Sequence, residues 1–470
     1  GPAIAVIWGW LPAMLWVVVG AVVVGCVHDF GALVVSARTG GMSIGVIAER
    51  LVGRRAKALL HALIFFAVAL AMGVFAYVVA ELFRPGAYPE AIAPSAVILV
   101  LALGIGLWTR RADRRLTAPV GIAFAVVLVV VAAAGSVPLR WDSGTGWTVV
   151  LLVYAWLASV LPVWSLLQPR DFLNSLLLYL GLGLTYVGFF VLRPSFAAPV
   201  LEVAPEGAPS MFPFVFVVIA CGAVSGFHSL VASGTTAKQL AREPHARPIG
   251  YGGMIGESLL GLAAVLACTA GFGSRGAWAA HYSSWGAASG LASTMGAFIE
   301  GCTRFVSGLG VPTDAARTLI AVVVVSFALT TLDSATRLLR YNVEEIGQGA
   351  GIRLLRHRAV SATVAVAAIA FFAFYRVDGT SAGLMLWKLF GSTNQLLAAL
   401  ALLVVSLYLL RLRRNALPYL VPMAFMMLGA AVAMTIELRG YARSGNVVLL
   451  AVGGAIAAIG VWLALEAVLA

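Results

Sequence analysis

Runs of about 18 or more apolar residues recur along the whole of this 470-residue chain. A run of that length is long enough to cross a bilayer as a helix. Charged residues make up 11% of the chain, whereas a soluble domain carries about 25%, and the mean hydropathy is +1.00. Runs such as 118–134 are apolar on every side, unlike the alternating strands of a membrane β-barrel. The sequence therefore predicts an all-α polytopic membrane protein.

We predict thirteen membrane-spanning helices in this chain. They lie near residues 11–36, 58–82, 92–108, 117–135, 147–167, 172–192, 213–236, 250–272, 314–336, 359–375, 383–410, 418–437 and 446–468. Taken alternately, the connections on one side hold 21 of the 31 Lys and Arg residues, and those on the other side hold nine. Because basic residues concentrate in cytoplasmic loops, this bias predicts a cytoplasmic C-terminus and an external residue 1. The net charge of +12 is thus explained by membrane topology and indicates no nucleic-acid partner.

The start of the chain gives a further expectation. It opens with Gly1 and Pro2, and no signal sequence follows. An external start of this kind predicts one more helix ahead of residue 1, for fourteen spans in the full protein.

The most informative polar segment is CGAVSGFHSLVASGTTAKQ, residues 221–239, which interrupts an apolar run. Glycine permits a helix to unwind, and the freed backbone groups and hydroxyls can line a solute site near the middle of the bilayer. Small residues also permit close helix packing without any site. We predict a discontinuous helix here. Its candidate substrate-binding residues are Ser225, Gly226, His228, Ser229, Ser233, Thr235 and Thr236.

Ionisable groups inside a membrane are costly, so each is a candidate for ion coupling or gating. His228 is the first, because histidine changes charge most easily near neutral pH. Asp29, next to His28, is the second, with anchoring at the membrane interface as the alternative. Glu257 follows a glycine-rich stretch and either carries a proton or caps its helix.

Asp333 and Arg337 complete the candidates for coupling or gating. They stand four residues apart on one helical face, near the inner end of a span. An intrahelical ion pair that neutralises itself and holds a cytoplasmic gate shut is as consistent with this spacing as a substrate contact.

A second interrupted element is WKLFGSTNQ, residues 387–395. Asn394 and Gln395 lie within a long apolar stretch, where amides need partners. They are candidates for substrate binding, with hydrogen bonding between helices as the alternative. The connection 273–313 contains an amphipathic stretch near 291–306, which predicts a short interfacial or re-entrant helix.

The sequence lacks the motifs that are typical of several classes of protein function. No soluble stretch exceeds about 40 residues and no Walker A motif occurs, which argues against primary pumping. The cysteines are scattered singly and no zinc or iron–sulfur spacing occurs, so we predict no metal site and no cofactor. No nucleophile and base can be paired, so we predict no catalytic residues and no enzyme activity. Secondary transport, a channel and a sensor remain, with a membrane enzyme that lacks these motifs as the least favoured class, and all of them would be embedded in the lipid bilayer.

Six blocks of the sequence resemble the carbon starvation protein A (CstA) family. They are GPAIAVIWGWLP at 1–12, VHDFGALVVSARTGGMSIGVIAE at 27–49, SGFHSLVASGTTAKQ at 225–239, ARPIGYGGMIGES at 246–258, TLDSATRLLR at 331–340 and LFGSTNQLLAALAL at 389–402. They follow the family order over nearly the whole chain. The Gly- and Pro-rich stretch that precedes GPAIAV in the family is absent here.

The resemblance implies a fold. Family members are assigned to the amino acid, polyamine and organocation superfamily, whose LeuT-like core has two inverted five-helix repeats, each opening with a broken helix. It implies one transmembrane domain over 1–470. The first repeat would cover about 1–135, inserted helices 147–192, the second repeat 213–410 and C-terminal helices 418–468. Gly1 and Pro2 would then be a remnant of the first broken helix.

The resemblance also implies a function. Family members are bacterial and archaeal inner-membrane transporters, described both as peptide permeases and as cation-driven importers of pyruvate. Our leading hypothesis is symport of a small carboxylate, pyruvate, with protons, in which the carboxylate lies at the unwound backbone near Ser225 and Gly226. Peptide transport, Na⁺ coupling, and a channel or sensor are the alternatives.

Overall fold

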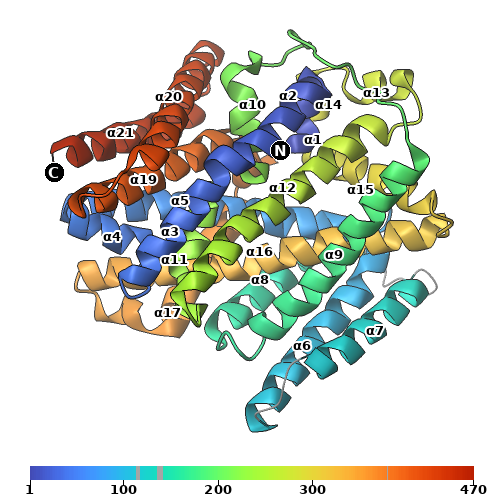
Figure 1. Cartoon of the computed structure of the whole chain (residues 1–470), viewed down its shortest axis with the longest axis horizontal. Coiled ribbons are helices and arrows are strands. Elements are labelled where there is room, and N and C mark those ends of the chain that lie inside the picture. The colour runs from blue at the N-terminus through green and yellow to red at the C-terminus, as the bar shows by residue number, and fades with distance from the viewer. Residues whose placement is uncertain (113–116, 135–140, 378, 470) are drawn as a thin grey trace.

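The computed structural model describes residues 1–112, 117–134, 141–377 and 379–469, and these are overwhelmingly helical (Figure 1). Ten helical segments are long and apolar enough to cross a membrane. Three shorter apolar helices, Ala118–Ala133, Gly144–Val160 and Arg358–Phe374, lie at three further predicted spans. Every predicted span therefore coincides with an apolar helix. Long apolar runs adopt helices because a helix satisfies its backbone hydrogen bonds internally, where lipid supplies none.

The first half of the chain contains the helices up to α9. They are α1 (Pro2–Ala5), η1 (Val6–Trp8), α2 (Trp10–Leu15), the π-helical η2 (Trp16–Gly25), α3 (Cys26–Arg38), α4 (Ile44–Leu51), α5 (Arg54–Leu82), η3 (Pro89–Ala91), α6 (Ile92–Ala112), α7 (Thr117–Ala133), α8 (Gly144–Val160) and α9 (Leu167–Leu192). Segments α2, η2 and α3 follow one another as a single long span.

The second half begins with the interrupted helix. Its elements are α10 (Met211–Ile219), η5 (Ala220–Gly222), α11 (Gly226–Gly234), η6 (Thr236–Gln239), η7 (Glu243–His245), α12 (Ala246–Ala270), α13 (Arg275–His281), α14 (Trp285–Ala288), α15 (Leu291–Ser307), α16 (Thr313–Gly349), η8 (Arg353–Arg356), α17 (Arg358–Phe374), β1 (Arg376–Val377), β2 (Thr380–Ser381), α18 (Ala382–Leu386), η9 (Trp387–Leu389), α19 (Phe390–Arg411), α20 (Leu417–Ser444) and α21 (Val447–Leu469). Strands β1 and β2 form an antiparallel pair.

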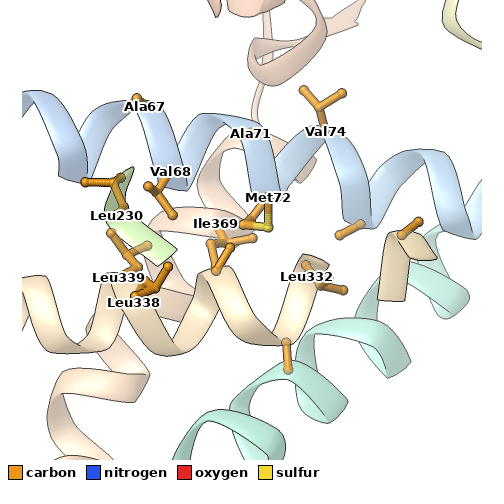
Figure 2. Close-up of a cluster of buried hydrophobic side chains, with 14 of the residues drawn as sticks. Ala67, Val68, Ala71, Met72, Val74, Leu230, Leu332, Leu338, Leu339 and Ile369 are labelled. Atoms are coloured by element: carbon orange, nitrogen blue, oxygen red, sulfur yellow. The ribbon is translucent and has the colours of Figure 1, made fainter. Parts of the chain in front are cut away.

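Helices α5 and α16 form the centre of the molecule and pack along each other. Figure 2 shows Val68 and Met72 of α5 beside Leu332 and Leu339 of α16, with Ile369 of α17 in the same cluster. All five side chains are buried. Close packing of this kind holds helices together in lipid, where apolar surface alone gives little driving force for association.

Helices at two edges of the molecule expose apolar side chains. Helices α20 and α21 lie at one edge, and α6 and α7 lie at the opposite edge (Figure 1). Large aliphatic residues such as Ile122, Val129, Val447 and Leu465 are exposed there. A surface of exposed aliphatic side chains is what a helix in contact with lipid presents.

The predicted discontinuous helix is confirmed. Helix α10 ends at Ile219, a 3-10 turn follows, and residues 223–225 are outside any helix before α11 begins at Gly226. The second predicted interruption is milder, because a single 3-10 turn, η9, joins α18 to α19. The amphipathic helix near 291–306 is confirmed as α15, which packs against α9, α12 and α16.

Candidate functional site

The break between α10 and α11 is packed tightly by the first long span. A Cβ atom at Gly25, where η2 ends, would overlap the carbonyl oxygen of Ala223 in the break. Only glycine therefore permits this approach. Ser225 has an extended backbone, with φ −132° and ψ 130°, and precedes the first turn of α11. The unwound residues thus lie directly beside the start of α3.

The side chain of Asn394, on α19, forms hydrogen bonds with the first turn of α11. Its Oδ1 accepts hydrogen bonds from the backbone N–H of Phe227 at 3.1 Å and from Ser225 Oγ at 3.2 Å. The first N–H groups of a helix have no partner within the helix, so a side-chain carbonyl from a neighbour satisfies one of them here. In this structure Asn394 joins two helices, and its oxygen lies where an anion would bind.

Asp29 lies between two histidines. Its Oδ1 is 2.7 Å from Nδ1 of His28 on α3, and its Oδ2 is 3.1 Å from Nδ1 of His228 on α11. Both oxygens of the carboxylate are therefore occupied by imidazole nitrogens. A buried carboxylate needs such partners, because an isolated charge in an apolar interior is very costly.

The two imidazoles differ in their access to solvent. The His28 side chain is fully enclosed, and its Nε2 is buried with no hydrogen-bond partner. The His228 side chain keeps 20% of its surface exposed. Of the two imidazoles, His228 is therefore the one with access to solvent. Glu257 of α12 lies close enough to interact electrostatically with both His228 and Asp29.

The hydroxyls of α11 are used within the fold. Ser229 Oγ donates to Gly226 O at 2.7 Å, and Ser233 Oγ donates to Ser229 O at 2.7 Å while accepting from the N–H of Ile44. Gly226 packs so closely on α19 that a Cβ atom there would overlap Leu397. These predicted substrate-binding residues are thus buried and engaged with other protein groups.

Three other predicted substrate-binding residues lie apart from the Asp29 pair. Thr235 and Thr236 follow the last turn of α11, about 10 Å along the helix from His228. Gln395 is buried in α19, where its Nε2 faces Met426 Sδ at 3.8 Å and its Oε1 has no hydrogen-bond partner. The structure therefore brings together Asp29, His228, Glu257, Ser225 and Asn394.

The predicted intrahelical pair between Asp333 and Arg337 is wrong. Asp333 forms its ion pair with Arg170 of α9 and accepts a hydrogen bond from the Tyr154 hydroxyl of α8 at 2.6 Å. Arg337 donates to the carbonyl oxygens of Ala158 and Leu161, at 2.5 and 2.7 Å. The cause is the packing of α8 and α9 on α16, which supplies a cation for Asp333 and the carboxyl end of α8 for Arg337.

Several residues of these sites carry little or no signal in the sequence. Gly25 and Tyr154 lie in apolar runs, and Arg170 lies in the short polar stretch 168–171 between two predicted spans. Only the packing of distant helices gives them a role. His28 carried a signal, because it is adjacent to Asp29 and lies inside a span. Among the described residues, no group of three or more His, Cys, Asp and Glu side chains is arranged to hold a metal ion.

Comparison with known families identifies the chain. The family model described as "Carbon starvation protein CstA" matches residues 1–272 and 276–433. The chain belongs to the CstA family. A "Peptide transporter CstA" of Bacillus subtilis is 30% identical over 490 residues, which cover 96% of this chain and 80% of the relative. A "Peptide transporter CstA" of Escherichia coli is 30% identical over 488 residues, covering 91% of this chain and 70% of the relative.

A second kind of relative carries a different name. A "Pyruvate/proton symporter BtsT" of Escherichia coli is 34% identical over 285 residues, covering 57% of this chain and 39% of the relative. A manganese transporter of Eremococcus coleocola aligns with 94% of each chain at 14% identity, and its TM-score of 0.42 is too low to carry an argument. The CstA-family chain described here is accordingly a multi-pass membrane protein of a transporter family.

Proposed function

We propose that this CstA-family chain is a secondary active transporter that imports a small carboxylate, pyruvate, in symport with protons. The observation that carries the proposal is the Asp29 carboxylate held between His28 and His228 at the break of a helix. A proton-coupled carrier needs a group that gains and loses a proton near neutral pH, inside the membrane and within reach of water. His228, partly exposed and paired with Asp29, meets each requirement.

The coupling step follows from this arrangement. A proton that reaches His228 forms an imidazolium, which Asp29 neutralises at 3.1 Å. Moving this neutral pair between the inward-open and outward-open states costs less free energy than moving a single uncompensated charge. Release of the proton to the opposite side then restores neutral His228. Glu257, in electrostatic range of both groups, is the neighbouring candidate for the relay.

The substrate carboxylate would bind at the first turn of α11. That turn offers the Phe227 N–H and the Ser225 hydroxyl, and the dipole of the helix favours an anion there. Asn394 Oδ1 holds these two donors in the described state. In our proposal the carboxylate displaces the Asn394 amide, which then rotates to donate its N–H groups to the substrate.

The order of helices supports an inverted-repeat, LeuT-like core. A long span, an amphipathic helix, a second long span and two further helices occur as α2–α3, α4, α5, α6 and α7. The same order recurs as α12, α15, α16, α17 and α18–α19. Arg38 at the end of α3 pairs with Glu243 just before α12, with Nε to Oε1 at 2.6 Å. The α2–α3 span and α12 therefore run in opposite directions, which is consistent with inversion.

Topology completes the proposal. Thirteen spans, comprising the ten long helices and the three shorter ones, put the loops that hold 21 basic residues on one side of the membrane. The positive-inside rule then assigns a cytoplasmic C-terminus. Membership of the CstA family supports a bacterial or archaeal inner membrane as the location.

The deciding experiment is uptake of labelled pyruvate into proteoliposomes under a pH gradient, a Na⁺ gradient or neither. Uphill accumulation that requires the pH gradient is the expected result. Accumulation that requires Na⁺ and is indifferent to pH would assign the coupling ion to Na⁺. Equilibration without accumulation would indicate a channel, and binding without flux a sensor.

A matched pair of histidine variants tests the role of His228. We expect His228→Gln to fold but to lose proton-driven accumulation, because glutamine cannot carry the proton. His357→Gln is the control, since His357 is exposed in the loop before α17. Accumulation at the wild-type level in His228→Gln would refute the assignment.

Peptide transport is the second candidate, because the relatives that cover most of this chain carry that name. Pyruvate and a peptide share the carboxylate that the first turn of α11 would bind, whereas a peptide also needs a partner for its ammonium group. Competition with labelled pyruvate by unlabelled di- and tripeptides discriminates the two. Peptide uptake without pyruvate uptake would move the assignment to peptides.

A further inference from the structure

His28 has no part in substrate binding or proton exchange as proposed above, yet it is among the most enclosed polar residues of the described chain. Its residue exposure is 1%. Its Nδ1 lies 2.7 Å from Asp29 Oδ1, which is shorter than the 3.1 Å between His228 and the other oxygen of Asp29. Its Nε2 is buried and has no hydrogen-bond partner.

These contacts fix the tautomer of His28. A carboxylate oxygen only accepts hydrogen bonds, so the nitrogen that faces it must carry the hydrogen. Nδ1 therefore donates to Asp29, and Nε2 bears the lone pair when the ring is neutral. His28 thus donates to Asp29 through Nδ1, and its enclosed Nε2 makes no hydrogen bond in the described structure.

We infer that His28 is the positioning residue of the coupling site: it holds the Asp29 carboxylate in the orientation that pairs with His228. The inference rests on the proposed function. Because Oδ1 is bound by His28, Oδ2 points to His228 across the interface between α3 and α11. Orientation by a neighbouring hydrogen bond is the role that the third member of a catalytic triad plays for its histidine.

The surroundings of Asp29 contain few other titratable groups that could take this role. They are Cys26 on α3, His228 on α11, Glu257 and Tyr251 on α12, and Tyr419 of α20 where it reaches Gly31 of α3. Of these groups, His228 bonds to the Asp29 carboxylate, and the other hydrogen bond to this carboxylate that the structure describes comes from His28.

Three substitutions at one position test the inference. Asparagine places its Nδ2 near the position of imidazole Nδ1, whereas glutamine reaches toward Nε2, and alanine supplies no donor. We expect His28→Asn to keep uptake close to wild type. His28→Ala and His28→Gln should lower the maximal rate of pH-driven pyruvate uptake by about tenfold or more, as the loss of a hydrogen bond to a charged group implies.

The readout that separates positioning from simple packing is the pH profile. Without His28 the Asp29 carboxylate turns away from the imidazolium of His228, so more acid is needed to charge the site. The pH of half-maximal uptake should move toward acid in His28→Ala and stay in place in His28→Asn. His61→Ala is the matched control, because His61 is equally buried and bonds to Asn342 on α16 instead. It should leave the profile unmoved.

The possible failures are distinguishable. If the wild-type protein takes up no solute in response to a pH gradient, the proposed function fails. If the wild type responds but His28→Ala, shown to be folded by its elution profile and thermal midpoint, keeps the wild-type pH profile, the positioning role is wrong. Equal loss in His28→Asn and His28→Ala would also overturn it, because the Nδ1 donor would then be irrelevant.

Discussion

Two buried aspartates of this transporter-family protein are held in opposite ways. Asp29, on α3, lies between two histidines, one of them partly exposed. Asp333, on α16, is fully buried and lies between Arg170 and the hydroxyl of Tyr154. Arginine stays charged at every physiological pH, whereas histidine changes charge near neutrality. The partner, and not the depth of the carboxylate, is therefore what makes the Asp29 site our candidate for proton exchange.

The Asp333 site has the features of a mechanical anchor. Arg170 also binds Asp171 at 2.7 Å, Asn174 donates to Thr330 at 2.6 Å, and Arg337 binds the carboxyl end of α8. The contacts of Asn174 and Arg337, together with the Arg170–Asp333 pair, fasten α8 and α9 to α16 at several points. A buried ion pair contributes little net stability, but removing one partner leaves an uncompensated charge. We therefore expect substitution of Asp29 to abolish transport and substitution of Asp333 to destabilise the fold.

The largest expected effect is at Asp29. Asp29→Asn removes the charge that balances His228, so proton-driven pyruvate uptake should fall to the level of protein-free liposomes. The variant should still fold, because asparagine keeps the shape and one acceptor. Asp314→Asn, at the exposed start of α16, is the control. Undiminished uptake in Asp29→Asn would show that Asp29 is not needed for proton-driven transport, and the proposed difference between the two aspartates would be wrong.

The next effect concerns Asp333. Asp333→Asn removes the fully buried one of the two carboxylates that pair with the Arg170 guanidinium, which should lower the free energy of unfolding by about 3–5 kcal/mol. Thermal unfolding in detergent, followed by fluorescence, measures the change. The double variant Arg170→Met with Asp333→Leu removes both charges and should recover most of the stability, as apolar replacements of buried pairs do.

The double variant also tests the anchor directly. If the pair only fastens helices, the recovered protein should transport pyruvate at a rate near that of the wild type. A protein that regains stability without transport would show that Asp333 takes part in the cycle, and the comparison with Asp29 would have to be redrawn.

A smaller effect is expected at Tyr154. Its hydroxyl donates to Asp333 at 2.6 Å and accepts from Arg170 at 2.7 Å. Tyr154→Phe keeps the ring and loses both bonds, which should cost about 1–3 kcal/mol in the same unfolding measurement. Uptake per folded molecule should remain unchanged. A shift of the pH profile in this variant would contradict the anchor.

The helical fold, an interrupted helix within 221–239 and the separate coupling candidates His228 and Asp29 could be predicted from the sequence, because each depends on local composition. Glycine and serine within an apolar run indicate an interrupted helix, and an ionisable group inside a span indicates a candidate functional site. The partner of Asp333 was unreachable, since Arg170 is 163 residues away and joins it only when α9 packs on α16. The same holds for Asn394, whose role depends on α19 lying against the start of α11.

The smallest expected effect concerns Glu49, whose ion pair with Lys57 is partly exposed. Lys57 donates to Glu49 at 2.6 Å, and this hydrogen bond lowers the pKa of the Glu49 carboxyl below its ordinary value. A lowered pKa contributes stability above the ordinary value, about 4.3, and the contribution is lost as the pH falls through the folded value. Glu49→Gln should therefore change stability by less than about 1 kcal/mol, since the pair is partly exposed. It should leave the uptake profile between about pH 6 and 8 unaltered, because Glu49 is ionised throughout. If the pH profile of uptake persists in Glu49→Gln and disappears in His228→Gln, the pH response belongs to the Asp29 site. If the profile moves in Glu49→Gln, part of the pH response belongs to the ion pair between α4 and α5.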